Sequence, residues 1–355
     1  MKEQWQEFLS NNGAVIEGNR VLHFGNPDQE RRVVTSGNIM VDLSHLGLIA
    51  AYGQDSQSFL QNQFCNDVRQ INPGISHLSG HCSAKGRLLS VFRLVQRGET
   101  YYMELPHDIL EDSLKKLRMF VLRSQVTLED NSDALVRIGF TGPKADQLLR
   151  EAVGGDVPQQ ANAVIQLNDL TLIRIGSTVP RFEIWGELEP LQQLWTRLDV
   201  HGAPAGADIW EWLDIQAGIP VVSKATIDAF VPQMLNLESL DGVSFSKGCY
   251  PGQEVVARMR YLGKLKRRMY LAHVDCDTPP QAGDNLFASS AESGQGAGKI
   301  VRLQPAPDGG YDLLAVIVIA SAEQEPIHLH DQNGPVLKIN PLPYTFESYG
   351  NVSGG

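Results

Sequence analysis

The feature that most constrains the fold is an order of predicted elements that occurs twice along the chain. Leu48–Tyr52 is predicted to be a strand, and the turn Gly53-Gln-Asp55 leads from it into a helix. Leu135–Phe140 is again a predicted strand, and Gly142-Pro-Lys144 leads into a second helix. In both copies, three further strands and a helix that begins at a proline follow. The order predicts an α+β body of two pseudo-repeated, ferredoxin-like β-α-β units with antiparallel sheets.

The character of the sequence changes after Lys264. Short alternating strands are separated there by turns rich in Gly, Pro and Asp, which is typical of a small β-barrel. The predicted domains are therefore a first α+β lobe at 1–130, a second lobe at 131–262, a C-terminal β-barrel at 263–347 and a flexible tail at 348–355.

Composition bounds the class of protein. The 355 residues are 42% hydrophobic and 20% charged, with a net charge of −11, which is ordinary for a soluble globular protein. The polar start of the chain lacks the apolar stretch of a signal peptide, and no apolar run is long enough to span a bilayer. The spacing of the four cysteines fits neither a zinc site nor a disulfide framework. We therefore expect a cytoplasmic protein with free thiols, no metal site and no membrane partner.

One stretch combines a reactive side chain with a backbone that needs special geometry. Gly248 and Gly252 flank Cys249, and apolar residues recur at helical spacing after Gly252. We predict a strand ending near Ser246, a tight loop with Cys249, and a helix from about Gly252 to Tyr261. A helix N-terminus and the nearby Lys247 would both favour a thiolate, which makes Cys249 and Lys247 the candidate catalytic residues. A small apolar cysteine buried in a turn is about equally compatible with the pattern.

The same region is basic. Between Lys247 and Arg268 there are seven basic residues and one acid, Glu254. The excess of positive charge indicates a polyanionic partner, whereas a solvated surface is the alternative.

A resemblance to a known family rests on these residues. Lys247-Gly-Cys-Tyr-Pro-Gly-Gln-Glu254, followed by Val-Ala-Arg258, resembles the signature of the YgfZ group in the folate-binding superfamily of the glycine-cleavage T-protein, an aminomethyltransferase. The resemblance extends to Ala84-Lys-Gly-Arg87, Ala217-Gly-Ile-Pro220 and the terminal Pro341-Leu-Pro-Tyr344. It therefore covers nearly the whole chain from about Val41.

The resemblance implies three domains in a ring, with a folate in the central cavity. It also implies a role in maturing or repairing iron–sulfur proteins, including tRNA-thiolating enzymes, that depends on Cys249. Trp210 stands where the family has a folate-contacting tryptophan, whereas a second tryptophan expected near Leu46 is absent. The residues predicted to bind the cofactor are Trp210, Tyr250, Gln253, Glu254, Arg258, Lys85 and Arg87.

One departure from the family concerns catalysis. The aminomethyltransferases carry a catalytic aspartate at a position that falls near Ser90, and no acid occurs between Lys85 and Gln96. The usual proton-handling group is thus missing. We therefore expect a folate-dependent accessory protein, and a one-carbon transferase or demethylase that uses Glu104 or Glu183 is the alternative. Direct tRNA binding through the basic segment is a third hypothesis.

Overall fold

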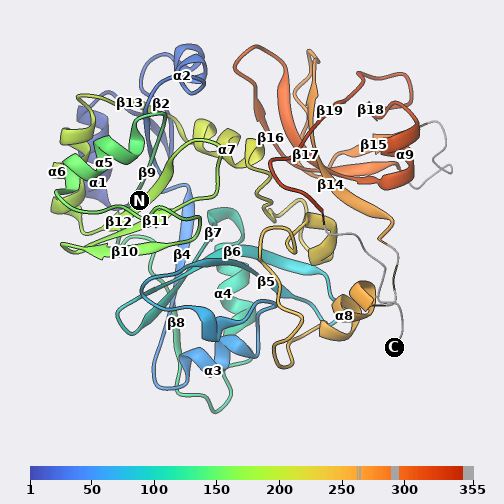
Figure 1. Ribbon diagram of the computed structural model, residues 1–355, viewed down its shortest axis with the longest axis horizontal. Coiled ribbons are helices and arrows are strands. Elements are labelled where there is room, and N and C mark those ends of the chain that lie inside the picture. Colours follow the sequence, from blue (N-terminus) through green and yellow to red (C-terminus); the bar gives the residue numbers. More distant parts are fainter. Residues whose placement is uncertain (262, 264, 289–295, 347–355) are drawn as a thin grey trace.

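The computed structural model describes residues 1–261, 263, 265–288 and 296–346. Within these ranges the chain forms three large sheets and a two-stranded ribbon (Figure 1). The predicted tail at 348–355 lies outside the described residues, as does Lys264 of the basic segment.

The first sheet has five antiparallel strands in the order β5-β6-β7-β4-β8. Its strands are β4 (Leu46–Tyr52), β5 (His77–Cys82), β6 (Leu88–Arg97), β7 (Thr100–Pro106) and β8 (Thr127–Asp130). Its helices are α3 (Ser56–Gln61), η1 (Val68–Gln70), η2 (His107–Ile109) and α4 (Leu110–Arg118). Because α3 and α4 contribute to one core with the sheet, both cover the same face.

The second sheet has six strands in the order β10-β11-β12-β9-β3-β13, in which only the β3–β13 pair is parallel. Its strands are β3 (Ile39–Asp42), β9 (Val136–Thr141), β10 (Val164–Leu167), β11 (Leu170–Arg174), β12 (Arg181–Gly186) and β13 (Ala203–Ala205). The elements packed around it are α1 (Glu3–Asn11), β1 (Val15–Glu17), β2 (Arg20–His23), α2 (Pro27–Val33), α5 (Ala145–Val153) and α6 (Leu188–Leu198). The two sheets have five and six strands, whereas a ferredoxin-like unit has four.

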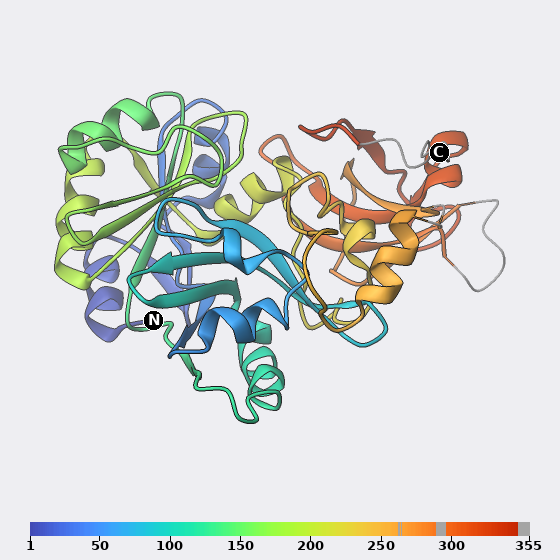
Figure 2. The ribbon, with the colours of Figure 1, turned by 60° about the horizontal axis from the view of Figure 1, so that its bottom comes forward.

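The two sheets face each other through the faces opposite α3 and α4 on the first sheet and α5 and α6 on the second, and residues of α7 pack in the same core. Successive side chains of a strand point to opposite faces, so Ile49 of β4 packs under α3 and α4 while Leu48 packs toward the second sheet. Leu48 shares a core there with Val41 of β3 and Trp185 of β12. This arrangement buries both faces of β4, and the two layers are visible edge-on in Figure 2.

The predicted lobe at 1–130 is divided between the two sheets. β3 pairs with β9 of the second sheet, and Trp5 and Leu9 of α1 pack in its outer core with α6. The order of elements along the chain does not specify which sheet takes an added strand. It therefore cannot locate the boundary between the two lobes. The second sheet therefore includes elements from the first 42 residues of the chain.

The C-terminal strands form a six-stranded antiparallel sheet in the order β18-β15-β16-β17-β14-β19. They are β14 (Arg267–Val274), β15 (Asn285–Phe287), β16 (Gly298–Pro305), β17 (Tyr311–Val318), β18 (His328–Leu329) and β19 (Lys338–Asn340). A bridge between His328 and Val336 links β18 to the segment before β19, so the sheet curls into a half-barrel. Strand β17 ends at Val318, because helix α9 (Ile319–Gln324) follows directly.

The segment between the second sheet and the half-barrel connects all three parts. It contains α7 (Ala207–Gln216), η3 (Pro232–Leu235) and α8 (Gln253–Tyr261). Figure 1 shows α7 between the second sheet and the half-barrel. Tyr250 packs in a core with Cys65 and Cys82 of the first sheet's side and Met269 of β14. The Cys249 stretch therefore packs on the first sheet and the half-barrel, as well as on Leu235 of η3 from its own predicted lobe.

Candidate functional site

A cavity of about 490 Å³ lies where the three parts of the molecule meet. Its wall includes Arg93 of β6, Glu104 of β7, Glu183 of β12, Trp210 of α7 and Arg302 of β16. The volume is within the range of small-molecule and cofactor sites. No single sheet supplies the wall, so the cavity exists only once both sheets and the half-barrel have packed.

Two buried carboxyl groups face each other in this cavity. Glu104 and Glu183 are each 5% exposed, and both line the cavity. Burial, followed by the charge of Glu183, raises the pKa of Glu104 well above its usual range, although Arg137 opposes the shift from 3.0 Å. The environment therefore favours the protonated form of Glu104 more than water does. The Oε2 atom of Glu183 is buried without a hydrogen-bond partner.

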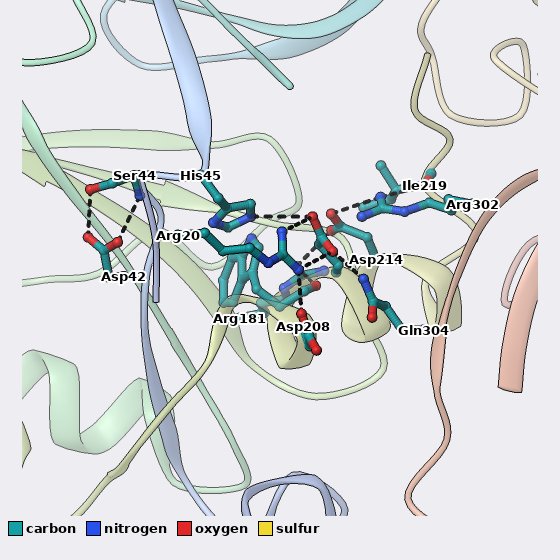
Figure 3. A network of polar contacts seen from close by, with 12 residues as sticks. Arg20, Asp42, Ser44, His45, Arg181, Asp208, Asp214, Ile219, Arg302 and Gln304 are labelled. Carbon is teal, nitrogen blue, oxygen red and sulfur yellow. Dashed lines mark hydrogen bonds and ion pairs between the residues drawn. The ribbon is translucent and has the colours of Figure 1, made fainter. Parts of the chain in front are cut away.

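A second polar cluster borders the cavity at α7 (Figure 3). Arg20 of β2 donates to both carboxylate oxygens of Glu211, at 3.0 and 2.8 Å, and forms an ion pair with Asp208. Burial alone would raise the pKa of Glu211, but the hydrogen bond and charge of Arg20 outweigh it and lower the pKa to about 2. The Nε2 atom of His45 lies 4.0 Å from Glu211.

Trp210 lines the cavity and is also packed. The residue is 1% exposed, and the guanidinium of Arg181 stacks over its ring at 3.8 Å. Arg181 also pairs with Asp214 at 2.7 Å. Trp210 thus forms part of a rigid wall that these contacts hold in place.

The Cys249 loop lies away from the cavity. Cys249 is exposed. All four cysteines have free thiols, and Cys65 and Cys82 are buried. Helix α8 begins at Gln253, which confirms the predicted helix. The predicted strand near Ser246 does not form; the backbone N–H of Ser244 instead donates to the carbonyl of Cys65 at 2.9 Å.

A close approach of two glycines joins this loop to the turn at 84–87. Gly252 has a φ of +80°, and a Cβ on it would lie 2.4 Å from the carbonyl oxygen of Ser83 and 2.5 Å from the Cα of Gly86. Only glycine fits that space and that backbone conformation. The contact places the turn that carries Lys85 and Arg87 beside the N-terminus of α8. Arg87 itself donates to the carbonyl of Ala229 at 2.6 Å.

Lys247 anchors the loop from beneath. Its side chain is buried, and its ammonium donates to the carbonyls of Gln61, at 2.6 Å, Asn66, at 3.1 Å, and Phe64. Burial lowers the pKa of Lys247 to about 8. These contacts tie residues 61–66 to the Cys249 loop, and the catalytic role of Lys247 stays a prediction.

Among the residues predicted to bind the cofactor, the structure brings only Trp210 to the cavity wall. Within the described part of the chain, the wall does not include the other six residues or Cys249. The Cys249 thiol therefore does not lie at the rim of this cavity. The physical reason is the packing of Gly252 on Gly86, which fixes α8 against the outer turn of the first sheet. The six other residues are Tyr250, Gln253, Glu254, Arg258, Lys85 and Arg87.

The basic segment is partly neutralised by neighbouring acids. Arg258 pairs with Glu254 on α8, and Arg260 pairs with Glu238 at 3.2 Å. Arg268 stacks on the ring of Phe346 at 3.8 Å. The surface is thus less positive than the sequence count suggests.

Comparisons with known proteins identify the family. Residues 7–240 match the family model described as the GCVT N-terminal domain. A protein of Colwellia psychrerythraea named "tRNA-modifying protein YgfZ" is 32% identical over 307 residues, which cover 86% of this chain and 93% of that protein. The chain belongs to the YgfZ group of the GCVT family. A protein of the same name from Yersinia enterocolitica is 31% identical over 306 residues, which cover 86% of this chain and 92% of that protein.

The fold is that of the glycine-cleavage T-proteins. The structure of aminomethyltransferase T from Bartonella henselae superimposes with a TM-score of 0.76 at 16% identity, and the match covers 99% of both chains. Ser90, at the position of the catalytic aspartate expected from the resemblance, is buried on β6. This member of the YgfZ group carries its buried carboxyl pair on β7 and β12 instead.

Sequence reasoning missed His45, Arg20 and Glu211 in this YgfZ-group chain. Each is isolated in sequence from its partners, and no short motif marks it. The described residues contain no cluster of three or more His, Cys, Asp or Glu that could hold a metal ion. In the same residues, no helix has both the length and the apolar character to cross a membrane.

Proposed function

We propose that this protein binds a folate in the central cavity and supports the assembly or repair of iron–sulfur proteins, and thereby tRNA modification. The observation that carries the folate proposal is the buried Oε2 of Glu183, which lacks a partner in the wall of a cavity of suitable volume. A pterin presents adjacent N–H donors on one edge of a flat ring, and a carboxylate accepts such a pair of donors. The implied ring of three domains would enclose this ligand.

The central cavity and the Cys249 loop have separate roles in this proposal. The residues that fit the pterin are Glu183 and Glu104, with Trp210 in the wall between α7 and β12. Cys249 is exposed on another face, where it is accessible to a protein partner. We expect the iron–sulfur proteins served, including tRNA-thiolating enzymes, to meet the Cys249 loop, and direct tRNA contact to involve α8. The relatives' name, "tRNA-modifying protein YgfZ", supports the link to tRNA.

Folate binding is tested by calorimetric titration of the full chain with 5-formyltetrahydrofolate. We expect Glu183→Gln to weaken binding by roughly 10- to 100-fold, because a hydrogen bond to a charged acceptor contributes about 1.5–3 kcal/mol. Glu187→Gln, an exposed carboxylate after β12, is the matched control and should bind as the wild type does. Equal affinities of the Glu183→Gln variant and the wild type would show that Glu183 does not bind the folate.

The accessory role is tested by complementation. We expect Cys249→Ser to fail to restore iron–sulfur enzyme activity to a strain that lacks the protein, whereas Cys276→Ser should restore it. Full rescue by the Cys249→Ser variant would refute the assignment of Cys249.

A one-carbon transferase is the second candidate, and the Glu104–Glu183 pair favours it. The raised pKa of Glu104 favours its protonated form, so Glu104 would serve as the general acid in place of the aspartate that Ser90 replaces. Turnover of tetrahydrofolate with aminomethyl or methylated donors, abolished in Glu104→Gln, would support this candidate. An absence of turnover with all such donors would refute the transferase candidate and favour the accessory role.

A further inference from the structure

His45 is a buried polar residue of the cavity wall whose two ring nitrogens both lack a hydrogen-bond partner. Its side chain is 4% exposed, and neither ring nitrogen makes a hydrogen bond among the described residues. It lines the cavity together with Arg20 and Glu211, and Figure 3 shows His45 beside Arg20. A buried donor or acceptor without a partner costs about 1–3 kcal/mol, so the free protein holds the imidazole in an unfavourable state.

The backbone turn that presents His45 is firmly held. Asp42 accepts hydrogen bonds from the backbone N–H and the hydroxyl of Ser44, at 3.1 and 2.8 Å, and from the indole of Trp5 at 2.7 Å. The first strand residue after the turn, Leu46, is fixed through its carbonyl by Arg137 at 2.7 Å. His45 therefore stands on a rigid support that links α1 to the cavity.

The charged groups around His45 keep it neutral. Burial is the main cause that lowers its pKa to about 4, and Arg20 and Arg137 act in the same direction. Glu211 and Asp214 oppose the shift but do not overcome it. A neutral imidazole has one N–H donor and one acceptor nitrogen, and it keeps both throughout the physiological range of pH.

Two other histidines show that burial alone does not explain this arrangement. His77 and His81 are also buried, and each has one ring nitrogen without a partner. Neither is among the residues that line the cavity. His81 instead packs against the rings of Phe64 and Phe120.

We infer that His45 is a ligand-binding residue, whose neutral imidazole hydrogen-bonds a polar group of the molecule in the cavity at the end bordered by Arg20 and Glu211. This inference rests on the proposed folate function and deepens it, since it adds a recognition point for a ligand with both donor and acceptor groups. Glu183 lies on β12, whereas His45 lies in the turn between β3 of the second sheet and β4 of the first, so one ligand that contacts both would be held at two separate points of the cavity wall.

The first test measures affinity for 5-formyltetrahydrofolate with the full chain. His45→Leu, which keeps the side-chain volume, should weaken binding roughly tenfold, and His45→Gln, which keeps a donor and an acceptor, should bind within about threefold of the wild type. The matched control His81→Leu should bind as the wild type does. The ratio between the affinities of the wild type and the His45→Leu variant should not change between pH 5.5 and 8, because His45 stays neutral in that range.

The second test separates this inference from the folate proposal. Because His45 lacks partners in the free protein, His45→Leu should raise the thermal midpoint without ligand by about 2 °C. If the wild type does not bind the folate but His45→Leu is stabilised, the folate assignment fails and the His45 site stands for another ligand. If His45→Leu lowers the midpoint and binds the folate as the wild type does, His45 is a structural residue and the inference is overturned.

Discussion

At the scale of single residues, the main determinant of chemistry is the protonation of Glu104. Burial and the charge of Glu183 raise its pKa well above the value of about 4.3 found in unfolded chains. The folded protein therefore binds this proton more tightly than the unfolded chain does. The free energy of unfolding consequently falls as the pH rises from about 4.3 toward the folded pKa.

Glu104→Gln should remove this dependence. The amide keeps a donor for Glu183 and an acceptor for Arg137 and has no proton to lose, so the variant should exceed the wild type in stability by on the order of 1–3 kcal/mol at pH 8. Urea unfolding at several pH values measures the difference. The control Glu99→Gln changes an exposed carboxylate in the turn between β6 and β7. Its free energy of unfolding should depend on pH as that of the wild type does. Parallel profiles for the Glu104→Gln variant and the wild type would contradict the shifted pKa.

At the scale of elements, the loop and α8 depend on one backbone contact. Gly252→Ala would force a Cβ to within 2.4 Å of the carbonyl oxygen of Ser83, at a φ of +80°. Such backbone strain costs about 1–3 kcal/mol before the clash is counted. Nothing lies within 4 Å of a Cβ at Gly248, so Gly248→Ala should change stability by less than about 0.5 kcal/mol.

Hydrogen exchange of residues 83–87 and 249–261 measures the effect of these two variants. In Gly252→Ala both segments should exchange faster, since each holds the other in place, whereas Gly248→Ala should exchange as the wild type does. Equal exchange in the two variants would show that α8 is held by other contacts.

The same elements show what the sequence can and cannot specify. Periodicity of apolar residues predicts α8 and most strands, because local burial determines that pattern. The position of Cys249 outside the cavity depends on Gly252 meeting Gly86, which are far apart in sequence. His45 and Glu211 are also far apart in sequence, and neither stands in a recognisable motif. Glu104 and Glu183 were found because each lies at the corresponding strand of the two predicted units.

At the scale of the whole molecule, α7 joins the two sheets to the half-barrel through polar contacts. Asp214 pairs with Arg181 of β12 at 2.7 Å and with Arg302 of β16 at 3.1 Å. Trp212 and Gln216 donate to Asp312 of β17 at 2.8 and 2.9 Å. Because the cavity lies among these parts, the same contacts that assemble the molecule also shape the site.

Asp214→Asn should therefore destabilise both the assembly and the site. It leaves Arg181, whose side chain is fully buried, without its counter-charge, and a broken buried ion pair costs roughly 3–5 kcal/mol. Asp208→Asn, on the same helix, removes a pair whose side chains are 30% and 36% exposed and should cost less than about 1 kcal/mol. Urea unfolding of the two variants measures the contrast, and folate titration should show weaker binding only for Asp214→Asn. Similar losses of stability in both variants would mean that the half-barrel is held to the body by apolar packing, and that Asp214 has no special part in closing the cavity.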